Sequence, residues 1–154
     1  MNILGINFGG HDTSATIIKN GEIIAACEQE RYDGIKHSRK FPIDAINDCL
    51  KISNLNLKEI DLVSYGMDNE LKLNELYYKR FINDEKNINF LIEDIDRIYK
   101  RQNIKDFIFK MLPGIKKIEF QNHHKCHLAS SFYPSNFKKA LITSYDGIGE
   151  IDSA

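Results

Sequence analysis

Apolar and polar residues alternate along the first 30 residues in the way that short β-strands require. Apolar runs cover residues 3–6, 15–18 and 23–27, with a polar, glycine-rich stretch after the first run and Asn20-Gly21 after the second. Asn-Gly between two β-branched runs is the strongest short signal for a hairpin, because both residues tolerate a positive φ. The pattern predicts three antiparallel strands.

Residues 42–66 predict a helix followed by a strand. Pro42 opens a stretch that keeps apolar residues at helical spacing as far as Ile52, and proline in the first turn removes no hydrogen bond that a helix needs. We expect a helix of about 12 residues here. Residues 62–66 have the apolar run of a short buried strand that ends in a turn.

The pattern becomes helical again from about residue 71. Charged residues alternate with apolar residues at helical spacing over 71–112, for example Phe81, Phe90 and Ile98. This spacing predicts two or three amphipathic helices. Pro113-Gly114 ends them.

The last part of the chain predicts a strand, a helix and a second strand. Residues 115–120 form the first strand, and 123–133 form a helix that begins after Asn122, a favourable N-cap residue. Residues 140–145 are apolar and predict a final strand that leads into Asp146-Gly147-Ile148-Gly149. This order of elements predicts an α/β fold with helices packed on a mixed five-stranded sheet.

The last predicted strand begins after the sheet looks complete. We therefore expect residues 1–137 to form a first lobe, with a helical insertion at about 71–112, and residues 138–154 to begin a truncated second lobe. A length of 154 residues with 42% hydrophobic residues is otherwise that of one compact domain.

Charge and cysteine content narrow the class of partner and the compartment. The net charge of −1 favours neither nucleic acid nor an anionic membrane. The chain has no long apolar run and no leader-like start, and its three cysteines are widely spaced. We expect a cytoplasmic protein with free thiols.

The five histidines are confined to three places, and two of them have metal-ligand spacing. His123 and His127 are four residues apart, so on a helix they share one face and can hold one divalent ion. Asp146, after the last strand, is the natural third ligand. The residues alone leave a second interpretation open, in which His127 packs the helix and His123 belongs to its cap.

Two glycine turns and one charged loop are further candidates for chemistry. The turn containing Gly9-Gly10 and the one after Asp146 allow backbone amides to approach a phosphate, although ordinary hairpin turns explain them equally well. Residues 28–40 are densely charged, which suits a solvated loop or an anion-binding loop. In the second case Lys36 neutralises a phosphate and His37 accepts a proton from a hydroxyl.

Three ordered motifs together resemble one protein family. ILGINFGGHDTSATII, EQERYDGIKHSRKFPIDAI and NHHKCHLASSFYPSNFKKALITSYDGIGE are similar to the amino-terminal part of the NodU/CmcH-type O-carbamoyltransferases. These are related in that lobe to the tRNA threonylcarbamoyl transferase and to the hydrogenase-maturation carbamoyltransferase. The resemblance is strong at both ends of the chain and weak in the helical middle, residues 71–112. It implies the first lobe of an actin and sugar-kinase-like (ribonuclease H-like) ATPase fold.

The resemblance also implies a reaction and its residues. Carbamoyl phosphate and ATP give a carbamoyl adenylate, from which the carbamoyl group passes to the hydroxyl of a small-molecule acceptor. The implied cofactors are ATP and a divalent metal, with iron first. By resemblance, the site residues are a catalytic pocket of His11, Asp12, Lys36 and His37, substrate contacts from Arg31 and Gly10, a nucleotide-phosphate turn of Asp146, Gly147 and Gly149, and metal ligands His123, His127 and Asp146.

Three functions remain in competition at this level. The first is the amino-terminal fragment of such an enzyme, with a second chain or a dimer mate covering the truncated lobe. The second is a non-catalytic half-domain that binds metal or a partner. The third is a metal-dependent hydrolase, which the lack of an HExxH pattern disfavours.

Overall fold

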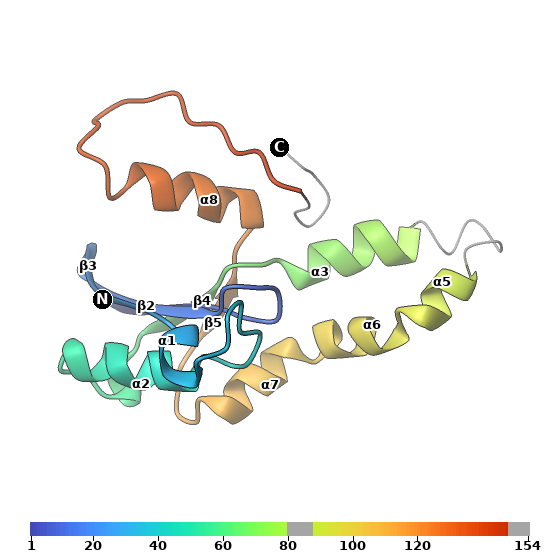
Figure 1. The fold of residues 1–154 in the computed structure, drawn as a ribbon, viewed down its shortest axis with the longest axis horizontal. Coiled ribbons are helices and arrows are strands. Elements are labelled where there is room, and N and C mark those ends of the chain that lie inside the picture. Colours follow the sequence, from blue (N-terminus) through green and yellow to red (C-terminus); the bar gives the residue numbers. More distant parts are fainter. Residues whose placement is uncertain (80–87, 148–154) are drawn as a thin grey trace. The chain divides into compact units, whose positions relative to one another are not determined.

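The computed structural model describes residues 1–79 and 88–147 (Figure 1). It divides into two compact units, each with its own internal contacts. Residues 1–66 and 108–119 form the first, which we name the sheet unit, and residues 67–107 and 120–154 form the second, the helical unit. The predicted boundary at residue 137 stays a prediction.

The sheet unit is built on a mixed five-stranded sheet, as predicted. The strand order is β3-β2-β1-β4-β5, with β1 antiparallel to β2, β2 antiparallel to β3, and β4 parallel to β1. The strands are β1 (Asn2–Asn7), β2 (Ser14–Lys19), β3 (Glu22–Glu28), β4 (Leu62–Tyr65) and β5 (Ile118–Phe120). Only three residues of the predicted strand 115–120 are in strand conformation.

The predicted hairpin joins β2 to β3. Asn20 and Gly21 have φ angles of 53° and 91°, which is the pair of positive values that a tight two-residue hairpin turn needs. The three amino-terminal strands therefore form a continuous meander. It ends at β3 and feeds into the short helix α1 (Glu30–Asp33).

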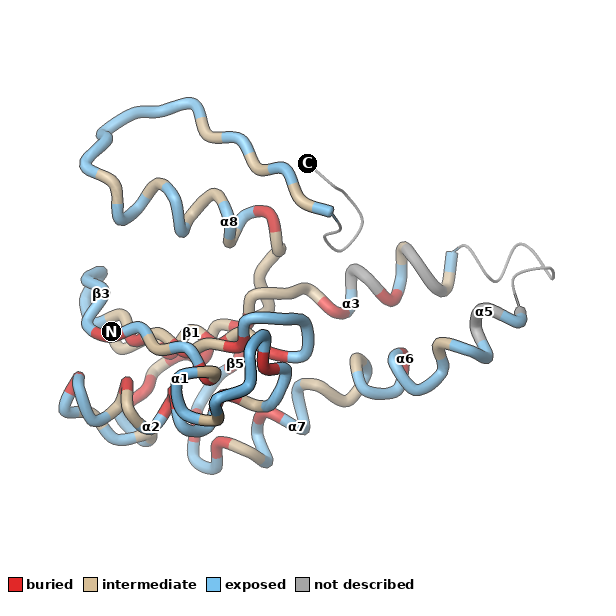
Figure 2. Tube along the Cα trace, viewed as in Figure 1, coloured by how far each residue is buried: buried red, intermediate tan, exposed pale blue. Residues whose placement is uncertain are grey.

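Helix α2 (Ile43–Ile52) covers the meander with Ala45, Ile46 and Cys49, which are all buried (Figure 2). Leu4 and Ile17 contribute fully buried side chains from β1 and β2. Pro42 stands at the N-cap, one residue before the helix begins. The short helix η1 (Leu57–Glu59) precedes β4.

The helical unit contains the amphipathic helices predicted between residues 71 and 112. These are α3 (Asn69–Lys72), the π-helix η2 (Leu73–Tyr78), α5 (Ile88–Glu93), α6 (Ile95–Gln102) and α7 (Ile104–Met111), followed by α8 (His123–Phe132). Phe81 lies outside the described residues. Beyond residue 107, α7 belongs to the sheet unit, where Ile108 is fully buried. None of the helices in the described ranges is long and apolar enough to cross a membrane.

The predicted strand at 140–145 is not a strand. The segment has no regular secondary structure and pairs with none of the described strands. Its side chains alternate between exposed and half-buried, and Leu141 and Tyr145 are 93% and 84% exposed. An apolar run marks a segment that suits a strand, but a strand exists only where a neighbour supplies hydrogen bonds.

Candidate metal centre

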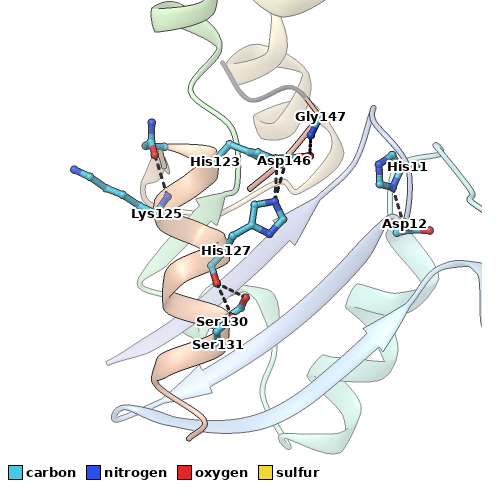
Figure 3. Close-up of polar contacts among 10 residues, drawn as sticks. His11, Asp12, His123, Lys125, His127, Ser130, Ser131, Asp146 and Gly147 are labelled. Carbon is cyan, nitrogen blue, oxygen red and sulfur yellow. Dashed lines mark hydrogen bonds and ion pairs between the residues drawn. The ribbon is translucent and has the colours of Figure 1, made fainter. Parts of the chain in front are cut away.

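Helix α8 presents two histidine side chains toward the same point (Figure 3). The helix begins as predicted, because the Asn122 side chain accepts a hydrogen bond from the backbone N–H of Lys125 at 2.9 Å. One turn apart, the rings of His123 and His127 have centroids 4.5 Å apart and cross at 83°. The hydroxyls of Ser130 and Ser131 donate to the His127 carbonyl.

Asp146 reaches the two histidines because the chain after α8 returns along the helix (Figure 1). Its Oδ2 lies 2.7 Å from Nε2 of His123 and 3.3 Å from Nε2 of His127, and the two Nε2 atoms are 3.0 Å apart. The exposure alternation over 141–147 places Asp146 on the half-buried side of this segment. Three possible ligand atoms thus converge on one point.

Protons alone cannot make all three contacts favourable. A carboxylate only accepts, and each Nε2 is either a donor or an acceptor. If both Nε2 atoms carry a proton, two N–H groups face each other in the contact between His123 and His127. If only one Nε2 atom carries a proton, the lone pair of the other faces the Asp146 carboxylate. One contact is repulsive in every assignment.

A divalent cation resolves this conflict, since all three atoms can then direct lone pairs at it. With ligands about 2.1 Å from a metal, donor atoms lie about 3.0 Å apart at right angles and about 3.4 Å apart in a tetrahedron. The observed separations of 2.7, 3.0 and 3.3 Å fall close to this range. The three residues therefore fit a metal. Among the described residues, they are one of two groups of potential metal ligands whose ligand atoms all lie within 4.8 Å of one another.

Asp146 is held in its charged form. Its hydrogen bond with His123 is the main reason that the pKa of the carboxyl falls from 3.8 to about 2. The backbone N–H of Gly147 also donates to Oδ1, at 2.6 Å. The carboxylate is therefore available as a ligand at any physiological pH.

The bond from Gly147 to Asp146 lies in the turn that was predicted to bind a nucleotide phosphate. The Gly147 amide, predicted to contact a nucleotide phosphate, is here engaged by the carboxylate of the preceding residue. Gly149 lies outside the described residues. The phosphate role of this turn stays a prediction.

A second cluster, in the sheet unit, brings together three of the predicted pocket residues. The Asp12 carboxylate bridges two imidazoles, with Oδ2 at 2.6 Å from Nδ1 of His11 and Oδ1 at 2.7 Å from Nδ1 of His37. These two hydrogen bonds lower the pKa of Asp12 below its usual value. Because a carboxylate can only accept, both Nδ1 atoms carry the proton, which leaves each Nε2 as the basic atom.

The loop that carries His37 is fixed by residues that sequence reasoning did not single out. Asp33 accepts from the Ile35 backbone N–H at 2.9 Å and from the Ser38 hydroxyl at 2.7 Å. Glu30 accepts from the His37 backbone N–H at 3.0 Å. The signal that could have found them is the Asp-Gly pair at 33–34, since Gly34 has a φ of 67° and turns the chain.

The Asp12 turn is anchored at its base by aromatic packing. The Phe8 ring lies 5.0 Å from those of Phe41 and Tyr65, and the Tyr65 hydroxyl donates to the Phe8 carbonyl at 3.0 Å. The Thr13 backbone N–H donates to the Ser38 carbonyl. The two loops that carry Asp12 and His37 are therefore tied together by backbone as well as by side chain.

Three other residues predicted to act in catalysis or substrate binding make no contact with the Asp12 cluster among the contacts that the structure describes. Lys36 is exposed in the loop beside His37. Arg31, on α1, forms an ion pair with Glu28 at 3.2 Å and lies near Glu30. Gly10 is exposed, with open space where a side chain would stand. Their substrate roles stay predictions.

Comparison with known proteins identifies the family. The model of the carbamoyltransferase N-terminus matches residues 2–154, nearly the whole chain. The chain belongs to the carbamoyltransferase N-terminus family. The resemblance read from the three motifs is thereby confirmed.

Two curated relatives are much longer than the region that this chain matches. Nodulation protein NolNO of Sinorhizobium fredii is 31% identical, over 93% of this chain and 20% of its own length. The uncharacterized protein sll1178 of Synechocystis sp. is 29% identical, over 96% of this chain and 26% of its own length. The chain thus spans about a quarter or less of these relatives. Among solved structures, YeaZ from Pseudomonas aeruginosa covers 44% of this chain and 30% of its own, with 13% identity and a TM-score of 0.35.

Proposed function

We propose that the chain provides a metal-centred phosphate site and a proton-accepting pocket for carbamoyl transfer. The reaction takes carbamoyl phosphate and ATP through a carbamoyl adenylate and delivers the carbamoyl group to an acceptor hydroxyl. The observation that carries the proposal is the convergence of His123, His127 and Asp146 within 3.3 Å. Membership of the carbamoyltransferase family supplies the reaction class.

His123, His127 and Asp146 would hold a divalent ion. Two imidazole nitrogens and one carboxylate oxygen suit iron and zinc, and we place iron first. When bound, the ion acts as a Lewis acid and template for the nucleotide phosphate. The side chain of His127 is 51% exposed, against 23% for His123. The exposed side of the cluster is where a phosphate oxygen would enter.

His37 is the residue we assign to accept the proton of the acceptor hydroxyl. Asp12 holds the Nδ1–H of His37 at 2.7 Å, so the imidazole presents a basic Nε2. Proton removal there would let the hydroxyl oxygen attack the carbamoyl carbon as the nucleotide phosphate leaves. Lys36, in the same exposed loop, would neutralise charge on the phosphate or carbamoyl oxygen.

Nucleotide binding that depends on the metal tests the proposal. Protein loaded with Mn²⁺ and desalted is titrated with a non-hydrolysable ATP analogue in a calorimeter, beside the same protein stripped with a chelator. We expect binding only to the loaded protein. His127→Ala should lose it, while Lys125→Ala, an exposed residue of the same helix, should retain it.

The outcomes separate the proposal from the non-catalytic half-domain. Metal uptake without any nucleotide binding would favour the half-domain. Equal nucleotide binding by the loaded and stripped proteins would contradict the phosphate role of the metal.

A further inference from the structure

Two cysteine side chains of the sheet unit meet where α2 packs on β3. Cys27, near the end of β3, is half-buried, and Cys49, on α2, is fully buried. The Cys49 thiol donates to the Ala15 carbonyl at 3.4 Å, and Ala15 stands directly opposite Cys27 in the pairing of β2 with β3. The helix therefore brings Cys49 to the level of the sheet at which Cys27 stands.

The two thiols interact directly. Burial is the main cause that raises the pKa of Cys49 to about 12, and the interaction with the Cys27 thiol is the second. Small side chains allow this approach, because Ala25 and Ala45 are buried where β3 and α2 pack together. A disulfide needs two backbones that lie close to each other. Neither thiol belongs to a disulfide in this structure, so the pair is a reduced dithiol.

Cys27 can be reached from solvent, whereas Cys49 cannot. Cys27 lines an open hollow of about 520 Å³, and the exposed fraction of Cys49 is 0%. The other residues of the hollow come from β2, β3 and α1, and they are Ser14, Thr16, Ala26, Glu28, Arg31 and Tyr32. A small oxidant that enters the hollow therefore meets the sulfur of Cys27 first.

Two further groups at Cys27 can handle its proton. The Cys27 thiol donates toward Oδ2 of Asp48 at 4.0 Å, and the Tyr32 hydroxyl donates to the same oxygen at 2.7 Å. The hydrogen bonds of Tyr32 with Cys27 and with Asp48 raise the pKa of the phenol above its ordinary value. Tyr32 thus stays a hydrogen-bond donor, while the Asp48 carboxylate is an acceptor.

We propose that Cys27 and Cys49 are a redox site, at which a hydroperoxide oxidises Cys27 and Cys49 then closes a reversible disulfide between β3 and α2. This pair takes no part in the metal centre or in the Asp12 cluster. Oxidation of an accessible thiol beside a second thiol is the chemistry by which such pairs form a disulfide.

The reaction has two steps when hydrogen peroxide is the oxidant. The Cys27 proton passes to Asp48 as the sulfur attacks one peroxide oxygen. The O–O bond breaks, and the leaving hydroxide takes the proton back and departs as water. The Cys49 sulfur then attacks the sulfenic acid on Cys27, so that the S–S bond forms, the S–O bond breaks, and the hydroxyl leaves as water with the Cys49 proton. Two thiols and one peroxide give one disulfide and two waters.

The disulfide would hold the end of β3 to α2 beside the loop that carries His37. Glu30, three residues after Cys27, accepts from the His37 backbone N–H at 3.0 Å. A covalent link between distant residues stabilises a fold mainly by restricting the unfolded chain. The oxidised protein should therefore unfold at a higher urea concentration than the reduced protein.

Thiol counting by mass spectrometry tests the site. The full chain, treated with a chelator to remove metal, is exposed to hydrogen peroxide, denatured and alkylated. We expect the number of alkylated cysteines to fall from three to one, and to return to three after dithiothreitol. Digestion without reductant should yield a peptide pair joined through Cys27 and Cys49.

Single variants establish the order of the two steps. With dimedone, which traps sulfenic acids, Cys49→Ala should be labelled at Cys27. In Cys27→Ala, Cys49 should be labelled at least about tenfold less, because it is buried. Cys126→Ala, a change in the helical unit, is the matched control and should form the disulfide as wild type does. Circular dichroism checks that each variant is folded, and the result for wild type does not depend on any variant.

Three results would overturn the proposal. They are a wild type that keeps three alkylated cysteines, a link that joins two chains or includes Cys126, and oxidation of Cys27 beyond the sulfenic acid without a link to Cys49. None of them bears on the proposed function, because metal and nucleotide are both left out.

Discussion

At the scale of single residues, the charge of Asp146 is set by its partners. The hydrogen bond with His123 lowers the pKa of the carboxyl to about 2, from 3.8. Since the folded value lies below the unfolded one, the bond stabilises the folded protein fully above about pH 4. The contribution disappears as the pH falls through about 2.

This shift can be measured by an NMR titration of the Asp146 side-chain carboxyl in metal-free protein. We expect a midpoint near 2. In His123→Ala the midpoint should rise toward 3.8, because the largest cause of the shift is removed. A midpoint that His123→Ala leaves unchanged would mean that the bond does not form in solution.

Also at the residue scale, the convergence of the three candidate ligands was easier to predict than the hydrogen bonds between the two loops of the second cluster. The spacing of His123 and His127 predicts that they share one face of a helix, and the placement of Asp146 after a predicted strand makes it the third candidate. Asp12 contacts its neighbour His11 and also His37, which is 25 residues away in the sequence. No local sequence pattern predicts the second contact. The three side chains meet because the two loops that carry Asp12 and His37 are folded against each other.

At the scale of elements, helix α2 depends on a side chain from outside the helix. Pro42 at the N-cap offers no side-chain acceptor. Gln29 takes that role, because its Oε1 accepts from the backbone N–H groups of Asp44 and Ala45, each at 3.2 Å, while its Nε2 donates to the Asp44 carboxylate at 2.7 Å. Gln29 is only 2% exposed.

Gln29→Ala should therefore destabilise the protein by about 1–3 kcal/mol, since it leaves the buried N–H of Ala45 and the part-buried N–H of Asp44 without their acceptor. Denaturant unfolding followed by circular dichroism measures the change. Asn47→Ala, an exposed position on the same helix, should change the free energy of unfolding by less than about 0.5 kcal/mol. Equal effects from both variants would contradict the capping role.

Elements were predicted best where the signal is local. The Asn20-Gly21 hairpin and the Asn122 cap follow from one or two residues each, and both are observed. The strand expected at 140–145 failed because an apolar run describes the segment itself and does not show that a neighbouring strand is there to pair with it. Gln29 looked like an ordinary polar residue at the end of a strand, and its burial depends on where α2 packs.

At the scale of the whole molecule, Asp146 links a long exposed segment to α8. Tyr133, Phe137, Leu141 and Tyr145 are each at least 70% exposed. A metal held by Asp146 and the two histidines would close this segment onto the helix. Exposed chain without regular hydrogen bonds is where proteases cut first.

Limited digestion with chymotrypsin should therefore respond to metal. Among the described residues, we expect early cuts between Tyr133 and Tyr145, and slower cutting there when Mn²⁺ or Zn²⁺ is added. In His127→Ala the added metal should give no protection at these sites. Equal protection of the variant would show that the metal acts elsewhere.

The most direct test of the central claim is the metal content of the protein. Wild type, His127→Ala and His11→Ala are loaded with Fe²⁺ without oxygen, or with Zn²⁺, then desalted and analysed by mass spectrometry of the metal. We predict about one ion per chain in wild type and in His11→Ala, and less than about a tenth of that in His127→Ala. Equal metal in wild type and His127→Ala, whether high or negligible, would contradict a metal centre at His123, His127 and Asp146.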